Sequence, residues 1–469
     1  MSLVTHYAAH SQQRVGPEVR STTVFEKLCL AATTLGALVF GLSLLWPEAP
    51  RALSSWYLQA VLSFGAVGGG LAGYFWSAYR NTPPGIRHDG LFFRGALTRG
   101  LWGWVAGVGM TAFYVALYWF PSLLEGPIRL ADPVAWHLYG GQADQWFLYG
   151  LLYTVAVLVF GLRMLMKYRH SRYHLLRTSS VMFFQLGFAF VLPNLLKAMS
   201  QPEFYFTYFW PLKPEYLLPW SWQADGLAGQ GAVFSGLTVG RAMLLWSAVM
   251  SVVAVPLFTY LWGKRWYCSW VCGCGGLAET LGDPYRQLSD NSTTAWKVER
   301  WMIHGVLLAI VGFTGLLWLQ HSTGLLGANL GGLYSKTYGF LVGAVFSGVV
   351  GVGFYPLLGS RVWCRFGCPQ AAILGLFQRF FSRFRITTNG GQCISCGNCS
   401  TYCEMGIDVR SYAQRGDNIV RASCVGCGVC AEVCPRGVLK LENGPAGNRF
   451  PRANKPLRAI RDAFRGRSE

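Results

Sequence analysis

The chain has 469 residues, of which 52% are hydrophobic and only 13% are charged, and its formal net charge is +19. So few charges and so much apolar surface exclude a single soluble domain of this length and indicate an integral membrane protein. The basic excess does not indicate nucleic-acid binding, because Lys and Arg beside membrane helices set their orientation and attract anionic lipid.

Apolar stretches of about 20 residues, the length that crosses a bilayer, recur along the chain. They predict eight transmembrane helices, at about 28–46, 56–76, 101–120, 146–166, 180–198, 243–262, 301–319 and 338–358. A polar tail precedes the first helix and no small-residue cleavage site follows it, so we expect a retained helix and not a signal peptide. The predicted fold class is mainly α, a polytopic bundle of membrane helices.

Basic residues crowd alternate loops of this arrangement. They are frequent in the N-terminal tail and in the segments 77–100, 163–177, 264–300 and 361–385, and sparse in the loops between. Lys and Arg next to membrane helices stay on the cytoplasmic side. The bias therefore predicts a multi-pass protein of the bacterial inner membrane, with both termini in the cytoplasm.

Three features of the membrane part bear on ligands. Gln185, in the otherwise apolar fifth span, is a candidate contact for a quinone, and a hydrogen bond between helices is the alternative. His304 is the one histidine within a predicted span, so we do not expect a haem. The loop at 204–222 is rich in aromatic residues, which favours the membrane interface over a docking site.

Two Cys-x3-Cys pairs follow spans six and eight, Cys268 with Cys272 and Cys364 with Cys368. Four residues make about one helical turn, so each pair can present two sulfurs on one face, and all four meet if the spans pack together. A third metal centre is one interpretation. Redox thiols and inert structural residues are the others, and Cys274 nearby has no assigned place.

Eight of the fourteen cysteines form two runs, Cys393-x2-Cys396-x2-Cys399-x3-Cys403 and Cys424-x2-Cys427-x2-Cys430-x3-Cys434. This is the spacing of a two-cluster bacterial ferredoxin, in which the fourth cysteine of each run ligates the other cluster. We assign cluster one to Cys393, Cys396, Cys399 and Cys434, and cluster two to Cys424, Cys427, Cys430 and Cys403. Zinc sites use two pairs and not two triplets, which disfavours zinc. Glu404 stands where proline is usual.

The chain thus divides into four parts. We expect a cytoplasmic tail at 1–27, a transmembrane domain at 28–385, a small α+β ferredoxin domain with two [4Fe-4S] clusters at 386–442, and a basic tail at 443–469. The last part has apolar residues at near-helical spacing, which predicts an amphipathic helix on the inner leaflet.

These features resemble the membrane-bound polyferredoxins that include NosR, the NapH-type quinol dehydrogenase subunit and CcoG, and the likeness to NosR is strongest. It runs from Arg172-Tyr173-His174 and the segment 181–185, through 262–270, to both ferredoxin runs. In that family two Cys-x3-Cys-Pro motifs lie on the cytoplasmic face. This chain keeps Pro369 but has Gly273 after the first pair. NosR also carries an external flavin-binding domain before its helices, and only about 27 polar residues precede them here, so we do not expect flavin.

The sequence predicts an electron-transfer component of an oxidoreductase system, with no catalytic residue assigned. Electrons would pass between the quinone pool or a cytoplasmic donor and a respiratory or copper-enzyme system. A nitrous-oxide or nitrate reductase, or its maturation proteins, is the simplest partner. One alternative is an assembly factor that uses clusters to reduce copper or thiols, and another is a cluster-bearing anchor subunit.

Overall fold

A computed structural model describes residues 22–46, 56–80, 82, 84, 85, 100–324 and 330–444. Within them, eight helices are long and apolar enough to cross a membrane, so the predicted bundle is confirmed. The N-terminal tail and the helix predicted on the basic C-terminal tail lie outside the described residues.

The first four spans come from the N-terminal half of the chain. Their elements, with the short helices between them, are α2 (Val24–Leu45), α4 (Trp56–Ala60), η1 (Val61–Gly65), α5 (Ala66–Arg80), α6 (Leu101–Trp119), η3 (Pro121–Leu124), α7 (Glu125–Tyr139) and α8 (Gln145–Lys167). Helix α2 begins with a capping box, in which Thr23 and Glu26 satisfy each other's backbone N–H groups. Helix α7, which forms most of the connection between spans three and four, was not predicted from the sequence.

The remaining spans are less regular. Their elements are α9 (Arg172–Phe183), η4 (Phe184–Val191), α10 (Leu192–Ala198), α11 (Val239–Val249), η8 (Met250–Ala254), α12 (Val255–Trp262), α15 (Thr293–Thr323), α16 (Leu330–Tyr338) and η10 (Gly339–Val350). The wider π-helical turns η4 and η8 come just before Pro193 and Pro256. Proline cannot donate a helical hydrogen bond, so the preceding turn loosens there.

Short elements connect spans five and six and surround the cysteine motifs. They are η5 (Pro214–Leu217), η6 (Pro219–Trp222), η7 (Leu227–Gly229), the strands β1 (Val233–Phe234) and β2 (Leu237–Thr238), α13 (Arg265–Cys268), α14 (Gly273–Glu279), η9 (Asp283–Leu288), α17 (Tyr355–Leu358), η11 (Trp363–Gly367) and α18 (Pro369–Phe380).

Three spans differ most from the prediction, and one of them, the seventh, runs from Thr293 to Thr323 and so extends beyond 301–319 at both ends. The fifth begins at Arg172, earlier than expected, because its polar first turns dock on the ferredoxin segment instead of facing lipid. The eighth ends at Val350, earlier than 358. The chain turns after it because Gly353 packs directly on span three, where a Cβ would lie 2.7 Å from Thr111 Oγ1.

The aromatic loop at 204–222, which we predicted at the membrane interface, contains several residues that do not face outward. Phe204, Phe209 and Tyr216 are buried inside the protein. The loop folds back into the bundle, where Tyr267 donates a hydrogen bond to the carbonyl oxygen of Thr207 at 2.7 Å. This contact joins the loop to the first Cys-x3-Cys motif.

The C-terminal segment is small and mixed. It contains β3 (Phe384–Thr388), η12 (Gly390–Gln392), α19 (Asn398–Thr401), α20 (Val409–Arg415), α21 (Val429–Glu432) and β4 (Leu439–Asn443). Strands β3 and β4 pair antiparallel, from Phe384 opposite Asn443 to Thr388 opposite Leu439, and so join the two ends of the segment.

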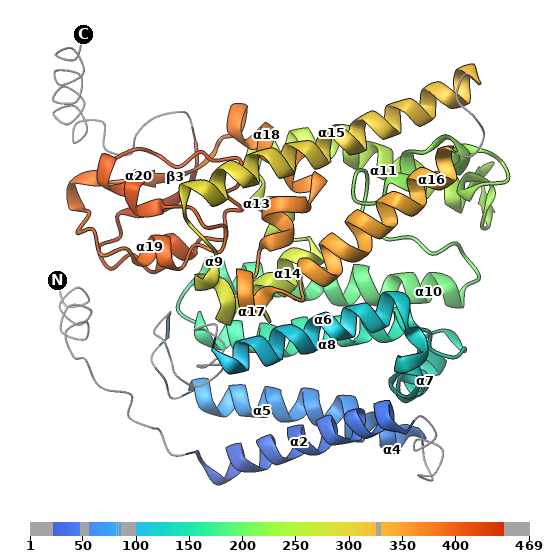
Figure 1. The fold of residues 1–469 in the computed structure, drawn as a ribbon, viewed down its shortest axis with the longest axis horizontal. Coiled ribbons are helices and arrows are strands. Elements are labelled where there is room, and N and C mark those ends of the chain that lie inside the picture. The colour runs from blue at the N-terminus through green and yellow to red at the C-terminus, as the bar shows by residue number, and fades with distance from the viewer. Residues whose placement is uncertain are drawn as a thin grey trace.

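The helices run side by side, and the C-terminal segment lies at one end of the bundle (Figure 1). Helices α2, α5 and α8 pack in sequence on one side, and α13, α14 and α17 lie between this group and α15. The bundle holds the segment by side chains that donate to its backbone carbonyls: Tyr173 to Gly426, Ser269 to Val425, and Gln378 to Cys424.

Candidate metal centres

Two cavities in the C-terminal segment are each lined by four cysteines. The first is lined by Cys393, Cys396, Cys399 and Cys434, and the second by Cys403, Cys424, Cys427 and Cys430. Each has a cavity volume of about 20 Å³. Each set takes three cysteines from one run and the fourth from the other. Four cysteines around an enclosed space are the ligand set of a [4Fe-4S] cluster, so these residues fit that group.

The two cavities differ in their access to solvent. Cys396 beside the first is exposed, whereas Cys424 and Cys430 beside the second are buried. Backbone N–H groups point at the trailing cysteines, from Ile407 to the Cys403 sulfur and from Val438 to the Cys434 sulfur. Such hydrogen bonds stabilise thiolate ligands and influence the potential of a bound cluster.

The two Cys-x3-Cys motifs have the same local architecture. In each, the first cysteine lies in a short helix and the second caps the next helix: Cys272 precedes α14 and Cys368 precedes α18. Their backbone angles nearly agree, with φ −66° and ψ 125° at Cys272 and φ −81° and ψ 111° at Cys368. Glycine in place of proline after Cys272 therefore leaves the motif conformation intact.

The four cysteines of these motifs are all buried and lie together. Burial raises the pKa of Cys368 well above its usual range, and the neighbouring sulfurs of Cys364, Cys268 and Cys272 raise it further. Ala371 N–H donates to the Cys368 sulfur at 3.4 Å. Buried thiols that destabilise one another's thiolates are suited to a cationic metal centre, which deprotonates coordinating thiols.

Cys274 lies beside this set. It forms a hydrogen bond with the Cys272 sulfur, and this interaction, against the effect of burial, lowers the pKa of Cys272 to about 7. The cysteine that the sequence left without a place is therefore a neighbour of the ligand candidates.

Gln185 is buried, and its amide nitrogen donates to Thr154 Oγ1 at 3.1 Å, which links spans five and four. Its carbonyl oxygen lies against the start of α14. A Cβ on Gly273 would be 2.8 Å from this oxygen and 2.7 Å from Tyr208 Oη. The close approach of these two polar atoms is the physical reason for glycine at this position.

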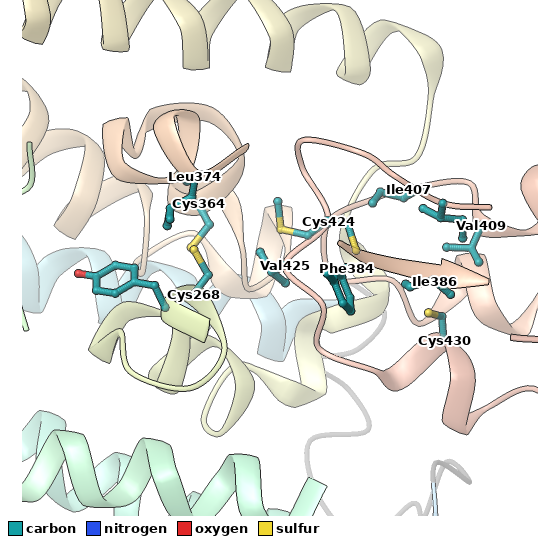
Figure 2. Packing of buried hydrophobic residues seen from close by; sticks show 14 of the residues in the cluster. Cys268, Cys364, Leu374, Phe384, Ile386, Ile407, Val409, Cys424, Val425 and Cys430 are labelled. Carbon is teal, nitrogen blue, oxygen red and sulfur yellow. The ribbon is translucent and has the colours of Figure 1, made fainter. Parts of the chain in front are cut away.

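The membrane motifs and the C-terminal segment share one packed cluster of buried residues. Figure 2 shows the Cys268 and Cys364 sulfurs next to each other, with Val425 and Phe384 between them and Cys430. Cys424 projects into the same region. Side chains from both groups of cysteines belong to this one cluster.

A network of buried charges runs beside this cluster. Asp283 pairs with Arg163 at 2.9 Å, with Lys167 at 2.8 Å and with Arg286 at 3.2 Å. Burial raises the pKa of Asp283, but Lys167, Arg163 and Arg286 outweigh burial and hold the pKa below its usual range. Arg286 continues the network to Glu404, at 2.8 Å.

Glu404 and the arginines around it were not predicted as site residues. The signal in the sequence was Glu404 in place of the usual proline, but the arginines that pair with it are remote in the chain. Arg361 contacts Glu404 at 3.1 Å and Glu279 at 2.6 Å, and Arg177 contacts Glu279 at 3.0 Å. These contacts join the membrane motifs to the C-terminal segment.

Two family profiles match the chain. A 4Fe-4S dicluster domain matches residues 392–439, and a 4Fe-4S binding domain matches residues 244–290 and 340–387. The first match, with its eight cysteines, supports two iron–sulfur clusters in the C-terminal segment. The second covers both Cys-x3-Cys motifs.

Similar proteins point to the same chemistry. YccM of Escherichia coli (strain K12), named for electron transport, is 26% identical over 199 residues, which cover 40% of this chain and 55% of YccM. The methylamine utilization ferredoxin-type protein MauN is 28% identical over 177 residues in Methylobacillus flagellatus and 30% over 162 in Paracoccus denitrificans. The MauN matches cover 37% and 33% of this chain and 58% and 54% of the relatives. The chain thus spans little more than half the length of each of these relatives.

No solved structure matches the chain. These similarities show that this chain is a homologue of iron–sulfur electron-transport proteins. The narrower likeness to NosR stays a prediction.

Proposed function

We propose that the chain is an electron-transfer protein of the bacterial inner membrane, and that Cys268, Cys272, Cys364 and Cys368 hold a third iron–sulfur centre. In the ferredoxin domain at 386–442, cluster one would be held by Cys393, Cys396, Cys399 and Cys434, and cluster two by Cys424, Cys427, Cys430 and Cys403. When bound, such clusters accept and release single electrons. The observation that carries the proposal is the single packed cluster that contains cysteines of the membrane motifs and of the ferredoxin runs.

The surrounding residues support this use of the cysteines. Burial at Cys268 and Cys364 excludes water from the membrane motifs. Backbone N–H groups donate to sulfurs at the trailing ferredoxin cysteines and at Cys368. A dry setting with oriented donors makes the potential of a bound group depend on a few defined contacts.

Orientation and partners follow from the same proposal. The basic residues in alternate loops support a cytoplasmic position for the ferredoxin domain and both termini. Exposed Cys396 offers a soluble donor the most direct approach to cluster one. Gln185, close to Gly273, is a polar group beside the membrane motif for exchange with the quinone pool. The acceptor would be a respiratory or copper-enzyme system of nitrous-oxide or nitrate reductase type.

The test is the iron and acid-labile sulfide content of anaerobically purified protein, with low-temperature EPR. We expect about twelve iron atoms in the wild type, and about eight when Cys268, Cys272, Cys364 and Cys368 are all replaced by serine. Cys29→Ser is the matched control, because Cys29 is a buried cysteine on α2 outside the three sites, and it should retain about twelve.

About eight iron atoms in both the wild type and the quadruple variant would contradict the third centre. The paired cysteines would then act as thiols or transient metal ligands, and the assembly factor would become the better interpretation. Normal electron transfer without the pairs would instead favour a membrane anchor.

A further inference from the structure

Arg361 lies between the membrane motifs and touches both. Its side chain is fully buried, and Nη1 donates to the carbonyl oxygen of Cys268 at 3.2 Å and to the Cys364 sulfur at 3.7 Å. A guanidinium keeps its positive charge at any pH a protein tolerates. A permanent cation is therefore in contact with one of the four candidate ligands of the third centre.

The two carboxylates that balance Arg361 come from different parts of the chain. Glu279 belongs to α14, which follows the first membrane motif, and lies 2.6 Å from Arg361 Nη2. Glu404 belongs to the ferredoxin segment, directly after Cys403, and lies 3.1 Å from the same nitrogen. Its side chain has no exposed surface. The glutamate found where ferredoxins usually have proline thus connects the two sets of cysteines through Arg361.

We propose that Arg361 is a positioning residue that sets the reduction potential of the third centre through the Cys364 sulfur, and that Glu404 offsets it from the ferredoxin side. The inference rests on the proposed function, since it requires a third centre. It adds a specific electrostatic link between that centre and cluster two, whose candidate ligand Cys403 adjoins Glu404.

The direction of each effect follows from charge balance. Reduction adds one electron and one negative charge to the third centre, while the neighbouring ferredoxin cluster that supplies the electron is oxidised by one. A cation near the sulfur stabilises the reduced form, and a carboxylate destabilises it. Both groups are buried, so water and salt screen them little. Removing Arg361 should lower the potential of the third centre, and neutralising Glu404 should raise it.

The experiment is a redox titration of the purified full-length protein, followed by EPR, with iron analysis on every sample. In Arg361→Gln we expect the equilibrium constant for reduction of the third centre to fall at least tenfold, about 59 mV for each tenfold change in a one-electron couple. Arg361→Lys keeps the charge and should stay within about threefold of wild type. Glu404→Gln should raise the constant about threefold or more.

Arg365→Gln is the matched control. Arg365 is also buried and also lies in the second motif, but its guanidinium pairs with Glu299 at 2.7 Å and with the backbone of Asp290 instead of a sulfur. Its replacement should change the constant less than about threefold.

An unchanged potential in both Arg361→Gln and Glu404→Gln, with about twelve iron atoms present, would overturn the inference and leave the third centre standing. About eight iron atoms in the wild type would instead overturn the proposed function. If Arg361→Gln does not retain its third-centre iron, the potential measured in Glu404→Gln tests the inference. A lowered or unchanged potential in that variant contradicts the inference.

Discussion

The ferredoxin segment and the membrane motifs build four-cysteine sites in opposite ways. In the ferredoxin segment, each cavity draws three cysteines from one short run and one from the other run, which is near it in the sequence. In the membrane part, Cys268 and Cys364 are far apart in the chain and meet within one cluster of buried side chains. The cysteines of the ferredoxin sites are close together in the sequence, whereas those of the membrane motifs come together only when the bundle folds.

The difference extends to the environment of the sites. Cavity one reaches solvent at Cys396, whereas the membrane motifs are enclosed and lie beside buried ion pairs. The ferredoxin cysteines are close together in the chain, whereas the cysteines of the membrane motifs come from segments almost a hundred residues apart. We therefore expect substitutions to act locally in the ferredoxin segment and through the whole bundle in the membrane part.

The largest effect should come from a ferredoxin ligand. Cys396→Ala should remove one cluster, lowering iron from about twelve atoms to about eight, while the EPR signal of the third centre persists. Iron analysis and EPR on the same sample test this. Cys29→Ala is the control and should keep the full iron content. Loss of the third-centre signal in Cys396→Ala would show that the two kinds of site do not form independently.

A smaller but global effect is expected at Asp283. Asp283→Asn removes the carboxylate shared by buried Arg163, buried Arg286 and half-buried Lys167, which should lower the free energy of unfolding by about 3–5 kcal/mol. Chemical unfolding in detergent micelles measures it. A loss below about 1 kcal/mol would mean that water reaches these charges in the native state.

A milder effect is expected at Gly273, where an added methyl group would press on Gln185 Oε1 and Tyr208 Oη. Both atoms are side-chain ends and can shift, so Gly273→Ala should cost about 1 kcal/mol and alter the EPR line shape of the third centre. Gly305→Ala is the control, because in the described part of the chain nothing beyond its own helix turn lies within 4 Å of an added Cβ. An unchanged spectrum in Gly273→Ala would show that the contact of Gly273 with Gln185 and Tyr208 does not influence the third centre.

The smallest effect is expected at an exposed ion pair of the ferredoxin segment. Arg415 lies 3.0 Å from Asp417, and its side chain is 51% exposed. Arg415→Gln should change the free energy of unfolding by no more than about 0.5 kcal/mol. A loss of unfolding free energy as large as that in Asp283→Asn would contradict the expectation that substitutions in the ferredoxin segment have only local effects.

Much of the fold could be predicted from patterns among residues that are close together in the sequence. The eight spans could be predicted because a bilayer requires about 20 apolar residues in a row. The cysteine runs could be grouped because ligand spacing in a ferredoxin is a property of the local chain. The inward fold of the loop at 204–222 could not be predicted, since its aromatic residues suit the interface as well as a protein core.

The candidate site divides in the same way. The Cys-x3-Cys pairs and the unusual Glu404 were visible as residues, but their connection was not. Arg361 and Glu279 carry no signal in the sequence, because a charged residue near a membrane helix is as readily explained by topology as by an ion pair.

By itself the sequence determined the class of the protein, its eight membrane spans and its two ferredoxin runs. Hydropathy and ligand spacing are properties of short stretches of the chain, so they can be recognised from the sequence alone. Only the tertiary structure decided that Cys268 and Cys364 lie together, that Glu404 reaches Arg361, and that the two groups of cysteines share one packed cluster. Each of these contacts joins segments brought together by helix packing, and packing depends on the shape and charge of all the surfaces at once.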